Sequence, residues 1–419
     1  MKLLIKGGRV VDPKSGRDAV GDVFLADGKI ASAAGTPDRT IDAKGLVVAP
    51  GLIDLAARLR EPGYEYKATL ESEMDAAVAG GVTSLACPPD TDPPLDEPGL
   101  VDMLRRRAKA LSRARVYPVG ALTVKLAGKQ LTEMAELAES GCVAFSQANV
   151  PVADTQVLWR ALQYAATFGF PVWLRAEDAW LAKGGVAHDG EVATRLGLAG
   201  IPAFAETIAL ALLFELVRAT GARVHICRIS SAAGVAMLRR ARHEGLPLTC
   251  DVGIHHLHLS DMDLGYFDSS CRLEPPLRSQ RDREALAAAL ADGTIDCAVS
   301  DHTPVDEDQK LLPFAEAEPG ATGLELLLPL TLKWGMERKL ALAQTLARIT
   351  SEPARILGVA SGRIEPGAPA DLALFDPQAS WRVTPQALKS QGRNSPFLGM
   401  ELSGRVRATI VAGNVVYEA

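Results

Sequence analysis

The sequence predicts an α/β protein in which a (β/α)8 TIM-like barrel carries a small accessory β-sandwich built from both chain ends. Between residues 51 and 358, about eight short apolar runs alternate with longer amphipathic segments. Both chain ends instead read as short strands separated by turns. The 419 residues are enough for one large barrel and one small module. We therefore expect domains at 1–50, 51–358 and 359–419, the first and last forming the sandwich together.

The first predicted strands lie within residues 2–49. They are LLIKGGRVVD, then DVFLADGKIASAA, in which Asp27-Gly28 is a hairpin signal, and then GLVVAP. The same pattern of short predicted strands recurs near the end of the chain, in ADLALFDP and VRATIVAGNVVYEA. Strands split between the two ends of a barrel suggest that they pair into one accessory module.

The predicted barrel strands follow helical patterns in a regular order. GVTSLACP comes after the helical pattern of residues 69–79, RVYPVGAL after VDMLRRRAKALSRA, and CVAFSQA after LTEMAELAES. The alternation continues through FPVWLRAED, ARVHICRIS, LPLTCDVGI and IDCAVSD. Active sites of such barrels lie at the carboxyl ends of the strands, so the polar residues just after each apolar run are the candidates for chemistry.

The amino-acid composition disfavours nucleic acid and membranes as binding partners. With 47% hydrophobic and 23% charged residues the chain is an ordinary globular protein, and its net charge of -6 gives no basic surface for nucleic acid or anionic membrane. The six cysteines form no C-x-x-C pair, which predicts free thiols. No apolar stretch is long enough for a signal peptide or a membrane span. We expect a soluble cytoplasmic protein without nucleic-acid or membrane partners.

The segment GLIDLAARLREPG at residues 51–63 is the first place where chemistry is expected. It resembles the first strand of the bacterial dihydroorotases, in the amidohydrolase superfamily, whose pattern is D-x-H-x-H-L-R-E-P-G. Asp54 and the residues from Leu59 to Gly63 match this pattern. The two metal-binding histidines do not, because Ala56 and Arg58 stand in their places.

The resemblance covers nearly the whole chain, and the same kind of replacement recurs. CPPDTDPP, GCVAFSQANVPV, WLRAED, RVHICRISS, RLEPPLR and SDHTPV are similar to the family's M-P-N-T-N-P-P, G-x-V-A-F-S-D-D-G-x-P-V, H-x-E-D, H-V-H-x-x-H-V-S, R-x-N-P-P-L-R and T-D-H-A-P-H. The departures in these segments are Asp90 for asparagine, Gln147 and Ala148 for two aspartates, Arg175 and Arg228 for histidines, Glu274 for asparagine and Val305 for the last histidine. Asp301 and His302 are retained.

These replacements remove the ligands of a catalytic metal. Opening a cyclic amide in this family needs a metal-activated hydroxide, which neutral imidazoles and carboxylates hold in place. Arginine stays protonated and has no lone pair to donate, and at about 4 Å it would repel a cation by roughly 4 kcal/mol per unit charge. We therefore expect no zinc and no catalytic residue, with Asp301 left as a vestige. Asp301 is expected to form ion pairs with Arg58, Arg175 or Arg228 at the barrel mouth.

The resemblance also implies remnants of substrate binding at Arg60, Asp90, Glu274 and His302. In the family, the arginine at the position of Arg60 grips the substrate carboxylate. A salt bridge between Arg60 and Asp90 is the favoured alternative, since Asp90 would repel a carboxylate ligand. His302 is expected to be a hydrogen-bonded packing residue.

The remaining histidines offer one alternative metal site. On a strand, His256 and His258 of the HHLH segment would share a face, as in an H-x-H pair. No carboxylate cluster at ligand spacing accompanies them, so a relocated site is disfavoured. His188 and His243 lie in polar sequence and are expected to face solvent.

The resemblance implies an inactive dihydroorotase homologue that acts as a non-catalytic partner of aspartate carbamoyltransferase in pyrimidine biosynthesis. Closed symmetry makes a homodimeric unit a reasonable expectation. One alternative is an active dihydroorotase or related cyclic amidase, working without metal or with one displaced to His256, His258 and Asp301. Another is a small-anion sensor that uses Arg58, Arg175 and Arg228.

Overall fold

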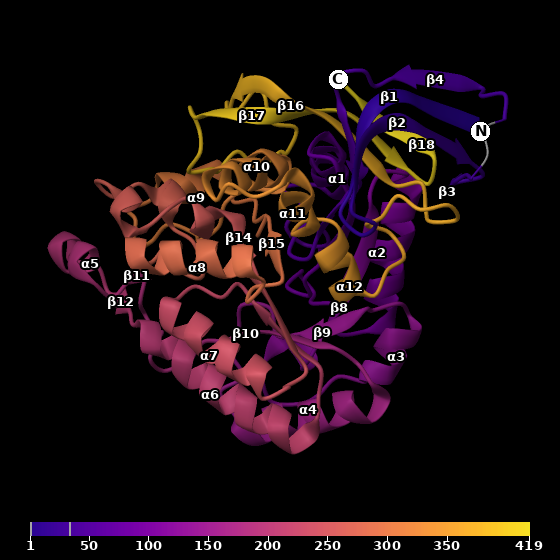
Figure 1. Ribbon diagram of the computed structural model, residues 1–419. Helices are drawn as coiled ribbons and strands as arrows, with labels where there is room; N and C mark the ends of the chain where they lie inside the picture. The colour runs from indigo at the N-terminus through magenta and orange to yellow at the C-terminus, as the bar shows by residue number, and fades with distance from the viewer. Residues whose placement is uncertain (1, 33–34) are drawn as a thin grey trace.

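The computed structural model describes residues 2–32 and 35–419, and it confirms the predicted barrel (Figure 1). Within these ranges, eight parallel strands follow one another in the order of the chain around the barrel. They are β6 (Leu52–Asp54), β7 (Val82–Cys87), β8 (Arg115–Ala121), β9 (Ala144–Ser146), β10 (Val172–Arg175), β13 (Val224–Cys227), β14 (Leu248–Gly253) and β15 (Cys297–Val299). Each coincides with one of the apolar runs of the sequence.

The barrel closes between its first and last strands, immediately before the mouth. Ala57 and His302 form a parallel bridge there. The amide of Arg58 donates to the carbonyl of His302 at 2.9 Å, and the amide of His302 donates to the carbonyl of Ala56 at 3.0 Å. The segments that carry Arg58 and Asp301 are therefore held side by side by backbone hydrogen bonds.

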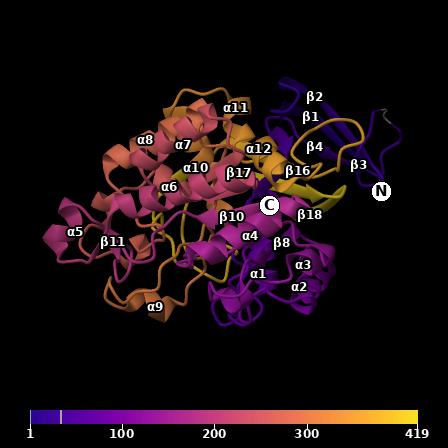
Figure 2. The same cartoon turned by 90° about the horizontal axis from the view of Figure 1, so that it is seen from below.

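Helices cover the outside of the barrel, as the alternation predicts (Figure 2). Several begin at a capping side chain. Thr69 accepts from the amide of Ser72, and Asp154 accepts from the amide of Gln156 at 2.8 Å. The helices are α1 (Leu70–Ala79), α2 (Pro98–Leu111), α3 (Met134–Glu139), α4 (Thr155–Phe168), α5 (Glu191–Leu196), α6 (Ala203–Thr220), α7 (Ala232–His243), α8 (Gln280–Asp292), α9 (Glu307–Leu311), α10 (Leu327–Glu337), α11 (Leu342–Ala347) and α12 (Ser351–Leu357).

Short elements lie in the loops at the carboxyl ends of the strands. The short strands β11 (Ala187–His188) and β12 (Gly200–Ile201) pair in parallel and form a two-stranded sheet beside α5. The 3-10 turns are η1 (Val124–Leu126), η2 (Ile254–Leu257), η3 (Asp261–Leu264), η4 (Ser269–Cys271) and η5 (Leu324–Leu326). Three of these turns, η2, η3 and η4, fall in the long connection between β14 and α8.

The accessory module is confirmed as a β-structure built from both chain ends. Among the described residues its strands form one continuous sheet in the order β18-β17-β16-β5-β1-β2-β3, with β4 also paired to β1. The hairpin predicted at Asp27-Gly28 joins β2 to β3, and both turn residues have positive φ. Residues 33–34, which end one predicted strand segment, lie outside the described residues. The strands are β1 (Lys2–Asp12), β2 (Arg17–Ala26), β3 (Lys29–Ile30), β4 (Arg39–Asp42), β5 (Val47–Pro50), β16 (Leu372–Arg382), β17 (Glu401–Val411) and β18 (Asn414–Glu418).

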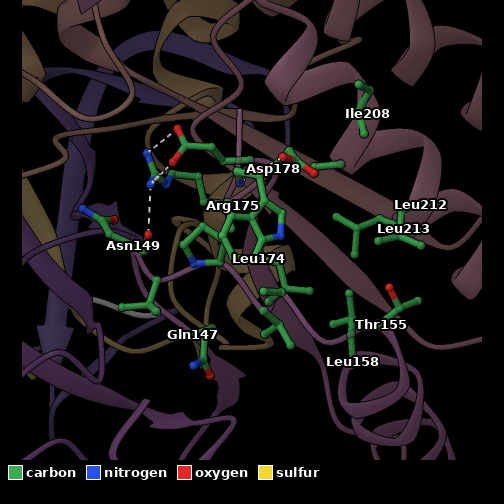
Figure 3. Close-up of a pocket in the computed structure, with 18 of the residues that line it drawn as sticks. Gln147, Asn149, Thr155, Leu158, Leu174, Arg175, Asp178, Ile208, Leu212 and Leu213 are labelled. Atoms are coloured by element: carbon green, nitrogen blue, oxygen red, sulfur yellow. Dashed lines mark hydrogen bonds and ion pairs between the residues drawn. The ribbon is translucent and has the colours of Figure 1, made fainter. Parts of the chain in front are cut away.

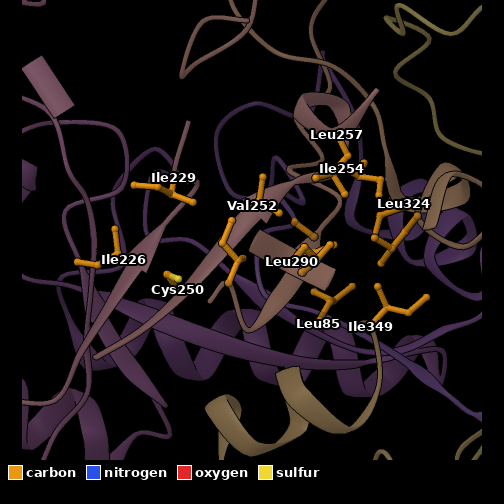
Figure 4. Close-up of a cluster of buried hydrophobic side chains, with 14 of the residues drawn as sticks. Leu85, Ile226, Ile229, Cys250, Val252, Ile254, Leu257, Leu290, Leu324 and Ile349 are labelled. Carbon is orange, nitrogen blue, oxygen red and sulfur yellow. The ribbon is translucent and has the colours of Figure 1, made fainter. Parts of the chain in front are cut away.

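The hydrophobic core lies mainly between the barrel strands and their helices (Figure 4). A separate cluster, including Trp173 and Val299, fills the barrel interior, and the accessory sheet has a cluster of its own around Leu372. The six cysteines, all within the described range, are free thiols. In the described part of the chain, no helix combines the length and apolar character that a membrane span requires. The mouth above this interior carries the buried charged side chains Arg58, Arg228 and Asp301.

Candidate functional site

The barrel mouth is formed by residues at the carboxyl ends of the strands or within four residues after them. Arg58 follows β6, Ala148 follows β9, Arg175 ends β10, Arg228 follows β13 and Asp301 follows β15. Ala148, Arg228 and Asp301 all have φ between 47° and 54°, in the left-handed region that non-glycine residues rarely adopt. Strained backbone of this kind gathers at sites where the chain must turn sharply to present a side chain.

Asp301 is held by two of the three arginines that replace histidines. Its Oδ1 lies 3.0 Å from Nη1 of Arg228 and 3.5 Å from Nη1 of Arg58. Both arginine side chains are only 5% exposed. The same two guanidinium groups converge on Oδ1 of Asn149, at 2.7 Å from Arg228 and 3.0 Å from Arg58. Two buried cations therefore share one carboxylate and one amide oxygen.

Arg175, the third arginine considered as a partner of Asp301, pairs with a different acid. It forms a two-pronged pair with Glu177, at 2.6 and 3.1 Å, and donates to the carbonyl of Asn149 at 2.9 Å (Figure 3). Glu177 is the nearer acid because it stands two residues along the same strand end. Arg175 still contacts the central network through the backbone of Asn149.

Arg60 also differs from the prediction. The salt bridge with Asp90 is made by Arg58, whose Nε lies 2.7 Å from Oδ2 of Asp90. Arg60 has φ 61°, which turns its side chain away, and its Nε donates to the carbonyl of Pro304 at 2.8 Å. Its charge faces Glu318 at 3.8 Å. The predicted Arg60–Asp90 bridge is therefore replaced by Arg58–Asp90.

The other predicted remnants lie in two different places. Glu274 joins the mouth, since its carboxylate accepts from Nδ2 of Asn149 at 3.0 Å. His302 points away from the mouth, with Nε2 2.5 Å from Oε2 of Glu73 and Nδ1 accepting from the amide of Gly323. His302 is thus a buried hydrogen-bonded residue, as the sequence suggested.

Charge balance shifts the pKa values of several mouth residues. Burial alone would lower the pKa of Arg228, but the charge of Asp301 raises it above the ordinary value. Burial would likewise raise the pKa of Asp90, and the charge and hydrogen bond of Arg58 lower it instead. Burial raises the pKa of Glu177 despite the nearby Arg175. Arg228 and Asp90 are thus held in their charged forms by their partners.

The family's metal does not fit this set of residues. The five positions that should supply ligands hold side chains without a donor lone pair, namely Ala56, Arg58, Ala148, Arg175 and Arg228. The one retained acid, Asp301, already accepts from two guanidinium groups. A divalent ion here would face the buried charge of Arg58 and Arg228, and the carboxylates of Asp301 and Asp90 already pair with these arginines. The donor chemistry is therefore that of an ion-pair network.

One group elsewhere in the described chain has metal-ligand types close together, and the sequence analysis missed it. His225, Cys227 and Asp251 bring their ligand atoms within 4.8 Å of one another on β13 and β14. Both ring nitrogens of His225 are hydrogen-bonded, to Asp251 and to Thr249, each at 2.8 Å. Burial raises the pKa of the Cys227 thiol well above its usual range. This group is a satisfied packing cluster.

The histidines considered as an alternative site do not come together. His256 lies in the η2 turn, not on a strand, and its Nε2 contacts the carbonyl of Pro275 at 3.0 Å. His258 contacts the carbonyl of Leu330 at 2.9 Å. His243 is exposed as predicted, whereas His188 is half-buried, with Nδ1 3.3 Å from Arg278. The H-x-H interpretation fails because a 3-10 turn separates the two rings.

Asn149 is the residue of the mouth that sequence reasoning missed. Its amide group links Arg58, Arg228 and Glu274, and its carbonyl binds Arg175. A signal was present, because Asn149 stands where the family pattern F-S-D-D-G has glycine. The loss of the family's aspartates and the gain of this amide fall in adjacent positions.

A pocket opens beside the mouth, between α4 and α6 (Figure 3). Its apolar wall includes Leu158, Leu174 and Leu212, and Arg175 and Asn149 stand at its polar end. Arg58, Arg228 and Asp301 do not line it. The pocket thus meets the mouth on the side of Arg175, Asn149 and Glu177.

Comparison with known proteins agrees with this architecture. A family model described as "Dihydro-orotase-like" matches residues 45–233. The chain is 46% identical to a "Dihydroorotase-like protein" of Pseudomonas aeruginosa, over all of both chains, and 42% identical to a "Dihydroorotase" of Geobacter sp. strain M21, also over all of both. The L-hydantoinase of Arthrobacter aurescens has a similar structure, with a TM-score of 0.87, 25% identity, and coverage of 99% of this chain and 96% of that one. With full-length identity at this level and the barrel fold in common, the chain belongs to the dihydroorotase-like family of the amidohydrolase superfamily.

Proposed function

We propose that this chain is a non-catalytic dihydroorotase homologue that serves as an assembly subunit of aspartate carbamoyltransferase. The observation that carries the proposal is the pairing of Asp301 with Arg58 and Arg228 where the family's pattern has metal ligands. Hydrolysis of a cyclic amide needs an activated water and a base to move its proton. Oδ1 of Asp301 already accepts from Arg58 and Arg228, so this carboxylate is fixed in an ion-pair network and is not poised beside an activated water.

The ion pairs also explain why the barrel can persist after its chemistry is lost. In a metal enzyme the cation balances the acidic ligands, and here buried arginines supply the balancing charge to Asp301, Asp90 and Glu177. Fold and reaction are separable in such a scaffold, so the outer surface can keep a binding role. The arginines already have internal partners, which favours this structural role over a small-anion sensor.

The 42%-identical relative named dihydroorotase supports the competing function, an active hydrolase of cyclic amides. Under that alternative the chain would open dihydroorotate through residues other than the lost ligands. The relative of higher identity carries the less specific name "Dihydroorotase-like protein", which leaves its activity open. Activity must therefore be measured on this chain itself.

The test combines turnover with complex formation. The purified chain is assayed with dihydroorotate beside an active dihydroorotase, and it is co-expressed with the aspartate carbamoyltransferase of the same organism for size-exclusion chromatography. We expect turnover equal to that of a buffer blank, and a single peak containing both chains. Turnover comparable to the active enzyme, or two separate peaks, would contradict the proposal. The Asp301→Asn variant is the control for trace activity, because contaminating enzyme would not respond to this change.

A further inference from the structure

Five large apolar side chains are exposed on two loops at the mouth end of the barrel. Met262, Tyr266 and Phe267 are 58%, 92% and 39% exposed, and Leu311 and Leu312 are 82% and 38% exposed. The first three belong to the connection after β14, and the other two to α9 and the residue after it. Scattered exposed apolar residues are normal, but a contiguous group on a protein surface marks a binding site. We call these five residues the Tyr266–Leu311 patch.

The two loops are fastened to each other, so the patch is one surface. Nζ of Lys310 donates to the carbonyls of Ser269 and Arg272 at 3.0 and 3.3 Å, and the hydroxyl of Ser269 donates to the carbonyl of Lys310. The rings of Tyr266 and Phe267 lie 5.5 Å apart, edge to face. Figure 2 shows α9 at the periphery of the molecule. A preformed apolar surface loses little conformational freedom when a partner covers it.

The rim of the patch is acidic. The exposed carboxylates of the two loops are Asp263, Asp268, Glu307, Asp308 and Glu316. Residues 261–272 and 305–318 contain two basic residues, Lys310 and Arg272. The ammonium of Lys310 donates hydrogen bonds to backbone carbonyls, and Arg272 is buried. Protein interfaces usually have an apolar centre and a polar rim, and a rim of one charge steers a partner of the opposite charge.

The loops that carry the patch also carry residues of the charged mouth. The connection after β14 also carries Glu274, and Asp301 is the second residue of the connection after β15. The two are tied again where the amide of Gly320 donates to the carbonyl of Arg272 at 2.8 Å. This bond therefore joins the two loops a second time, beside the contacts of Lys310 and Ser269.

We infer that the Tyr266–Leu311 patch is the docking surface for a different protein chain, whose contact surface has an apolar centre and a rim of lysine and arginine. Charge complementarity favours this occupant. A second copy of this chain would bring another acidic rim against the first, and an anionic membrane would also be repelled. The inference deepens the proposed function and rests on it, with the transferase chain as the partner to be tested.

The test measures binding of the full-length chain to the transferase by biolayer interferometry. In one variant the apolar centre is charged, by Tyr266→Asp with Leu311→Asp. In a second the rim is reversed, by Glu307→Lys with Asp308→Lys. The control is Val20→Asp, at a side chain 75% exposed on β2 of the accessory sheet. All five positions are exposed, so each variant is expected to keep the unfolding midpoint of the wild type.

We expect the apolar-centre variant to bind at least about 100-fold more weakly, since two central anchors are lost. The rim variant should mainly slow association, and raising the salt concentration should slow the wild type in the same way. The control should bind like the wild type. Unchanged binding by both patch variants would overturn the inference and leave the proposed function standing. Absence of binding by the wild type would overturn both, and loss of self-association in place of transferase binding would make the occupant a second copy.

Discussion

Replacing Asp301 with asparagine is expected to destabilise the chain by about 3 to 5 kcal/mol, the cost of removing one partner from a buried ion pair. The substitution leaves the guanidinium groups of Arg58 and Arg228, each only 5% exposed, without the carboxylate between them. Asp90 balances only Arg58, and Asn149 offers an uncharged oxygen. Urea unfolding at pH 7, followed by circular dichroism, measures the change.

The sign of the change in stability distinguishes an ion-pair network at the mouth from a metal site. If Asp301 were a metal ligand among acidic neighbours, removing its charge would relieve repulsion in the metal-free protein and would stabilise it or leave it unchanged. Glu136→Gln is the matched control, because Glu136 is an exposed acid of α3, and it should alter stability by no more than about 0.5 kcal/mol. An Asp301→Asn variant as stable as this control would show that the arginines do not depend on Asp301.

The second large effect is a pH dependence centred on Glu325, between the barrel and the accessory sheet. Burial raises the pKa of Glu325 to about 7, although the amides of Lys389 and Ser390 donate to its carboxylate. The usual glutamate pKa near 4.3 applies to the unfolded chain. The folded chain therefore holds a proton that the unfolded chain releases, and this contribution to stability is lost as the pH rises from about 4.5 through 7.

Glu325→Gln removes this titration, so its stability relative to the wild type should depend on pH. Between pH 5 and pH 8 the difference should move by about 2 kcal/mol in favour of the variant. Other titrating groups cancel in the comparison, because both proteins contain them. Urea unfolding of both proteins at the two pH values checks it. A constant difference would show that Glu325 titrates normally.

Periodicity predicted most of the fold because each barrel strand is a short apolar run bounded by a helical pattern. The hairpin at Asp27-Gly28 was predictable for a local reason, since both positions need positive φ. The accessory strands could be assigned to one module, but their joining into one continuous sheet depends on β5 pairing with both β1 and β16. Such long-range pairing leaves no local pattern in the sequence.

The sequence predicted which residues lie at the mouth, but it did not predict all of the ion pairs that they form. Arg58 and Arg228 do contact Asp301, because the strand ends converge there. The partner of Arg60 could not be read from spacing, since its left-handed backbone redirects the side chain towards Pro304. Arg175 forms its ion pair with Glu177, the acid nearest to it in the sequence. The domain boundaries, the absence of zinc, the homodimer and the transferase partner stay predictions.

Zinc content tests the central claim most directly. The chain is produced in zinc-supplemented medium, desalted without chelator and measured by plasma mass spectrometry, beside an active dihydroorotase and the Asp301→Asn variant. With arginine at three of the ligand positions we predict below about 0.1 zinc per chain, and the same value for the variant. About one or more zinc per chain in the wild type, lost in the variant, would contradict the replacement of metal by guanidinium.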